Sequence, residues 1–162
     1  MHPLTVEQLD PLQPTAIIFA GKSTGVAMHT LLSVIRMFPD HFKNFVFLTA
    51  GIVDVESFLG QSALEAMRST VQKNLQYFVD YCHQYHIAAE AYVSFGTDTV
   101  EELTKLADKV SKKYTNCVFF SSKIIFEHDN FVTRFLHNET PFTLQRHLHL
   151  LGKELVILPM KV

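Results

Sequence analysis

The sequence predicts an α/β domain with a doubly wound, five-stranded parallel sheet and helices on both faces. Short, continuous apolar runs, typical of strands buried on both faces, alternate with longer segments whose apolar residues recur at helical spacing. Strands that alternate with helices form parallel sheets through right-handed crossovers. The 162 residues suffice for one domain with a sizeable core.

Five apolar runs predict the strands, and four periodic segments predict the helices. The expected strands are residues 16–20, 44–50, 88–95, 116–121 and 155–158. The expected helices are residues 26–38, 63–86, 100–110 and 141–151.

Capping residues precede three of the expected helices. Ser62 is placed to cap the second helix, and Thr97 or Asp98 is placed to cap the third. Pro141 suits the first position of the fourth helix because its fixed φ is compatible with a helix start, and Thr140 then takes the capping position.

Composition and charge exclude several classes of protein. The net charge is −2, without the clustered Lys and Arg that nucleic-acid binding requires, so we expect no nucleic-acid partner. The basic run of residues 109–113 lies near an expected helix end, where cations are favourable. No apolar run reaches the ~18–20 residues of a membrane span. Residues 1–14 lack a signal-peptide pattern and predict an extended lead-in to a single domain over 15–162.

The segment 19–25 (FAGKSTG) raises the question of a phosphate-binding loop. Gly21-Lys22-Ser23 matches the end of the pattern G-x-x-x-x-G-K-[ST], but Ala16 stands where its leading glycine belongs. The preceding residues read as a strand, so no loop is present to curl around a phosphate. The segment therefore predicts a strand-to-helix bend whose amides have a general affinity for anions.

Ligands of doubly wound sheets bind at the carboxyl ends of the strands, where the winding reverses. The loops after the first, second and fourth strands and the start of the last helix therefore supply the candidate cofactor contacts. They are Gly21, Lys22, Ser23, Thr24, Thr49, Gly51, Ser121, Ser122, Asn138 and Thr140. We expect no cofactor, with ATP or AMP as the alternative ligand. For Asn138 and Thr140 a plain helix cap is the competing interpretation.

Metal and catalytic signatures are weak. The histidine pairs, at 83/86 and 147/149, lack the third ligand that zinc needs, so we expect surface histidines and no metal. Cys82 and Cys117 lie in apolar segments and predict buried thiols in a reducing compartment.

No nucleophile elbow occurs, and Ser121-Ser122-Lys123 reads as a polar loop rather than as an activated serine. Glu65 and Glu90 have no acidic partner for acid–base catalysis. We therefore expect a protein that is not an enzyme, with a small hydrolase using Ser121 or Ser122 as a third function class.

Residues 122–139 follow no clear period and are rich in phenylalanine. These side chains either close the sheet edge as core or form an exposed docking patch. They are Phe126, Phe131, Phe135 and, just beyond, Phe142.

The order of strands and loops resembles the universal stress protein fold. Members of that family that bind ATP carry an acid after the first strand, a G-x-x-G pair after the fourth, and a G-[ST] pair nine residues later. This sequence has residues 21–23 (GKS), 121–124 (SSKI) and 138–140 (NET) at those places. Side chains there obstruct the close approach of phosphate to the backbone. The resemblance therefore implies the architecture without the ATP site.

Two blocks of sequence are similar to a narrower group. Residues 29–54 (HTLLSVIRMFPDHFKNFVFLTAGIVD) and 135–162 (FLHNETPFTLQRHLHLLGKELVILPMKV) resemble the C-terminal domain of some bacterial amino acid permeases of the amino acid–polyamine–organocation superfamily. That resemblance implies a non-enzymatic regulatory or assembly domain in the cytoplasm, tethered to the inner membrane by the transmembrane part of its permease. It also implies a homodimer formed through residues 155–162. The alternative is a stand-alone, universal stress protein-like nucleotide-binding protein.

Overall fold

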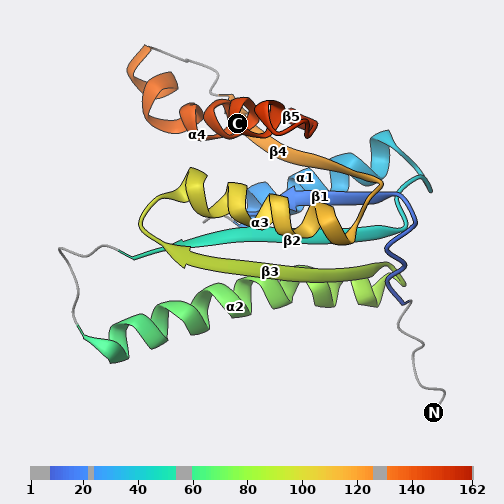
Figure 1. Cartoon of the computed structure of the whole chain (residues 1–162), viewed down its shortest axis with the longest axis horizontal. Coiled ribbons are helices and arrows are strands. Elements are labelled where there is room, and N and C mark those ends of the chain that lie inside the picture. Colours follow the sequence, from blue (N-terminus) through green and yellow to red (C-terminus); the bar gives the residue numbers. More distant parts are fainter. Residues whose placement is uncertain (1–7, 22–23, 54–59, 126–130, 162) are drawn as a thin grey trace.

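The computed structural model describes residues 8–21, 24–53, 60–125 and 131–161, with the backbone alone for 123–125, 131–140 and 161 (Figure 1). Strands and helices alternate along the chain. The strands are β1 (Thr15–Phe19), β2 (Asn44–Ile52), β3 (Ala88–Gly96), β4 (Cys117–Ile125) and β5 (Leu155–Lys161). The helices are α1 (Thr24–Met37), α2 (Gln61–Gln84), α3 (Thr99–Lys113) and α4 (Phe131–Leu150).

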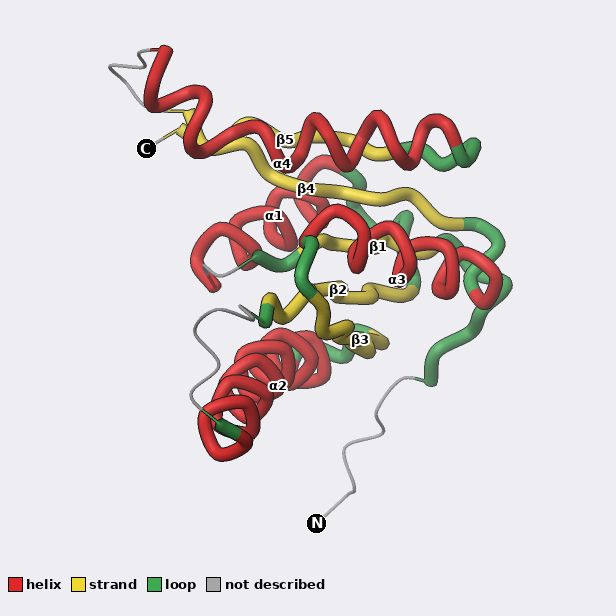
Figure 2. Tube along the Cα trace, turned by 60° about the vertical axis from the view of Figure 1, so that its left-hand side comes forward, coloured by secondary structure: helices red, strands yellow, loops and turns green. Residues whose placement is uncertain are grey.

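The five strands form one parallel sheet in the order β3-β2-β1-β4-β5. The chain winds outward from β1 to β3, crosses back to β4 beside β1, and ends at β5. Helices α1 and α2 cover one face, and α3 and α4 cover the other (Figure 2). The predicted doubly wound α/β fold is confirmed.

Strand β1 lies in the centre of the sheet and is buried along its whole length. Its residues alternate between the two cores: Ala16 and Ile18 join the cluster under α1 and α2, while Ile17 and Phe19 join the cluster under α3 and α4. Because both faces are covered, the strand is continuously apolar rather than alternating. Burying a Phe or Ile side chain here stabilises the fold by roughly 1.5–3 kcal/mol each.

The fourth helix differs from its prediction. Helix α4 begins at Phe131, ten residues before Pro141, which lies inside the helix. The prediction that Pro141 starts this helix with Thr140 as its cap was therefore wrong, as was the expected irregular stretch up to residue 139. A proline removes one hydrogen bond in a helix interior. The helical spacing of the apolar residues at 131, 132, 135 and 136 is the signal that the proline masked.

The structure confirms the predicted cap of α3 and corrects the predicted cap of α2. The Oδ1 atom of Asp98 accepts a hydrogen bond from the Glu101 amide at 2.8 Å, which confirms Asp98 as the α3 cap. Helix α2 begins at Gln61 after Gly60, without a side-chain cap, so the prediction for Ser62 was wrong. Gly60 has φ 99°, a conformation that glycine adopts without steric cost.

Residues 8–14 are anchored to the sheet through the buried side chain of Asn44. Asn44 Oδ1 accepts from the Asp10 amide at 3.1 Å, and its Nδ2 donates to Asp10 O at 2.6 Å and to Thr15 Oγ1 at 2.9 Å. The Pro14 carbonyl also accepts from the Lys43 amide at 2.8 Å. This part of the lead-in is thus fixed at the amino ends of β1 and β2, while the domain boundary at 14/15 stays a prediction.

Candidate ligand site at the carboxyl edge of the sheet

The winding of the sheet reverses between β1 and β4, so the carboxyl ends of these two strands mark the position where such folds bind ligands. Among the predicted contacts at or near it, Gly21 follows β1, Thr24 begins α1, and Ser121 and Ser122 belong to β4. Lys22 and Ser23 lie outside the described residues.

Strand β1 ends before its neighbours do. Phe19 pairs with Leu48 of β2, and Ile18 pairs with Phe120 of β4. Strand β2 then continues to Ile52 beside β3, and β4 continues to Ile125 beside β5. The residues that directly follow these last pairings, Thr49 on β2 and Ser121 on β4, therefore flank the end of β1.

Thr49 and Ser121 are both buried, with 8% of their surface exposed. Neither hydroxyl makes a hydrogen bond to the described part of the chain. They point to opposite faces, because Thr49 alternates in phase with Phe45 and Phe47 under α1 and α2, whereas Ser121 alternates in phase with Phe119 under α3 and α4. The sheet separates the two hydroxyls, so they do not converge on one small ligand.

The hydroxyl of Ser122 is bound to helix α1. Ser122 Oγ and Thr30 Oγ1 form a short hydrogen bond, and Thr30 Oγ1 also donates to the Val26 carbonyl at 2.9 Å. Because a threonine hydroxyl has one proton, Thr30 accepts and Ser122 donates in this arrangement. Ser122 therefore has lone pairs but no proton to offer a bound phosphate.

Gly51 lies beneath an aromatic side chain. A Cβ atom at residue 51 would lie 2.3 Å from a ring carbon of Phe95 on the paired strand β3. The guanidinium carbon of Arg68 on α2 lies 5.1 Å from the centroid of the same ring. The ring thus packs directly against Gly51. This packing explains why residue 51 is a glycine without invoking a bound ligand.

The structure says less about the surroundings of the remaining candidate residues. A Cβ atom at Gly21 would meet no atom of the described residues within 4 Å, so the backbone of Gly21 is not packed against them. Asn138 and Thr140 lie within α4, on residues described by their backbone alone. Ligand contact by all of these residues stays a prediction.

A second polar cluster lies near the amino edge, where β3 meets the end of α3, and sequence reasoning missed it. Glu90 Oε1 accepts three hydrogen bonds: from Tyr114 Oη at 2.6 Å, Tyr92 Oη at 2.7 Å and Lys113 Nζ at 3.0 Å. Burial by itself raises the pKa of the Glu90 carboxyl, but these hydrogen bonds outweigh it and hold the pKa below its ordinary value of 4.5. The only local signal was that Glu90 and Tyr92, two apart on a strand, share a face.

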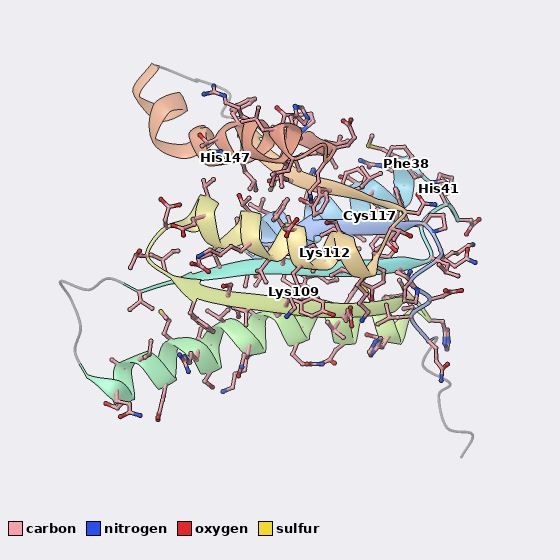
Figure 3. The ribbon with its side chains drawn as sticks, in the orientation of Figure 1. Phe38, His41, Lys109, Lys112, Cys117 and His147 are labelled. Carbon is pink, nitrogen blue, oxygen red and sulfur yellow. The ribbon has the colours of Figure 1, made fainter. Side chains whose placement is uncertain are left out.

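Figure 3 shows Lys109 and Lys112 on α3, on the face of the sheet that carries this cluster. Lys109 Nζ lies 5.5 Å from the ring centroid of Tyr92, and Lys112 pairs with Asp108 at 3.1 Å. The predicted basic run is thus partly neutralised, as on a solvated helix end. Glu90 Oε1 already accepts hydrogen bonds from three protein donors. The Glu90 cluster therefore links the end of α3 to β3.

Histidines and cysteines form no metal centre within the described residues, where no group of three or more ligating side chains occurs. His83 Nε2 lies 3.3 Å from the Ala89 carbonyl oxygen, and His147 Nδ1 lies 2.9 Å from the Thr143 carbonyl oxygen. Both cysteines are free thiols; Cys82 is buried, as predicted, whereas Cys117 is partly exposed. Burial raises the pKa of the Cys82 thiol to about 12.

Across the ranges that the structure describes, no helix is both long and apolar enough to cross a membrane. A scan against protein-family models, a search of curated proteins and a search of solved structures each found no match to this chain.

Proposed function

We propose that this chain is a non-enzymatic regulatory or assembly domain of an amino acid permease, attached in the cytoplasm to the transmembrane part of that transporter. The proposal rests on the resemblance of residues 29–54 and 135–162 to the C-terminal domain of such permeases. A doubly wound parallel sheet is the architecture that this resemblance implies.

A role without catalysis or nucleotide binding is favoured by the described side chains at the carboxyl ends of the strands, which offer few free hydrogen-bond donors. Ser122 donates its proton to Thr30, and the Phe95 ring covers Gly51. Thr49 and Ser121 lie on opposite faces of the sheet. A triphosphate needs several convergent donors, usually backbone amides of a glycine-rich loop. The described residues at this edge of the sheet offer few such donors.

The test of the permease proposal is the genomic reading frame that encodes Met1. We expect ten or more apolar segments of about 20 residues upstream in the same frame. A stop codon directly upstream of a start codon at Met1 would remove the proposal.

The proposed assembly is a homodimer through β5. Among the described strands, β5 pairs only with β4, so its other backbone edge has no partner strand there, and Val156 is 37% exposed. An apolar edge strand is prone to pair with another chain. Pro159 lacks an amide donor, which restricts such pairing to part of the strand.

A stand-alone nucleotide-binding protein is the second candidate, and two features favour it. The first turn of α1 lies at the reversal of winding, and the buried hydroxyl of Ser121 on β4 makes no hydrogen bond within the described part of the chain. Helix N-termini favour anions in general.

Calorimetric titration of the whole chain with ATP and with AMP separates the two candidates. The permease proposal expects no heat of binding at micromolar concentrations. Micromolar affinity that falls in Ser121→Ala and persists in the matched exposed-site variant Ser62→Ala would establish the nucleotide-binding alternative instead.

A further inference from the structure

We draw no further inference here: the strongest candidate, the partly exposed flank of α2 formed by Met67, Tyr77 and Tyr81, carries nothing because no contact in the described part of the chain shows what covers it.

Discussion

Tyr114 has no exposed surface, and its hydroxyl donates to Glu90 Oε1 at 2.6 Å. This bond joins the residue that follows α3 to the edge strand β3, 24 residues earlier in the chain. A buried phenol needs such a partner, because an unsatisfied polar group costs about 1–3 kcal/mol. The Glu90 cluster is therefore expected to contribute to the stability of the fold.

Replacing Tyr114 by Phe tests that contribution. Removing the hydroxyl deletes a hydrogen bond to a charged acceptor, which we expect to lower the free energy of unfolding by about 1.5–3 kcal/mol. Chemical denaturation measures the change. Tyr92→Phe is the matched control; it removes a donor to the same oxygen from a less buried ring and should cost less. Equal stability of the Tyr114→Phe variant and the native chain would contradict the prediction.

The cluster also predicts a pH dependence. The pKa of Glu90 is lowered in the folded protein, so its stabilising contribution is present above the ordinary value of 4.5 and is lost as the pH falls through the folded pKa. The stability difference between the native chain and Glu90→Gln should therefore be constant near neutral pH and shrink below about pH 4.5. Denaturation midpoints across this range measure it, and a difference that grows on acidification would refute the assignment.

Gly51 and Gly21 form a matched pair of substitutions. In Gly51→Ala the new methyl group would overlap the Phe95 ring, so we expect a loss of about 1–3 kcal/mol from overpacking. Gly21→Ala adds a methyl group where no atom of the described residues lies within 4 Å, so it should change stability little. Thermal unfolding compares them, and the additional change Phe95→Leu should recover part of the loss at Gly51. Similar unfolding temperatures for the two alanine variants would show that the Phe95 ring does not require the glycine.

Val156→Lys tests the proposed dimer. A charge on the exposed apolar side of β5 opposes edge-to-edge pairing, so we expect the mass in solution to fall from dimer to monomer. Leu150→Lys is the control, since Leu150 is 82% exposed at the end of α4, outside the strand. Light scattering at several concentrations gives the mass. A Val156→Lys dimer as stable as the native one would rule out this edge.

The cysteines predict different reactivities. Cys82 is fully buried and its pKa is raised to about 12, so almost no thiolate exists at pH 8 and alkylation should require unfolding. Cys117 is partly exposed, although burial also raises its pKa, and should react faster in the folded protein. Mass spectrometry after iodoacetamide treatment distinguishes the two sites. Faster labelling of Cys82 than of Cys117 in the native state would contradict the burial that the fold assigns.

Local sequence alone determined the alternation of strands and helices and the parallel sheet, because apolar periodicity acts over a few neighbouring residues. It narrowed the cap of α3 to Thr97 or Asp98, and the structure selects Asp98. It misplaced the start of α4, since Pro141 favours a helix start but the helix continues through it. Only the tertiary structure decided that Ser122 donates to Thr30, 92 residues away, and that Phe95 covers Gly51. Such contacts depend on the register between strands and on the position at which each helix packs against the sheet. No short stretch of sequence encodes either of these.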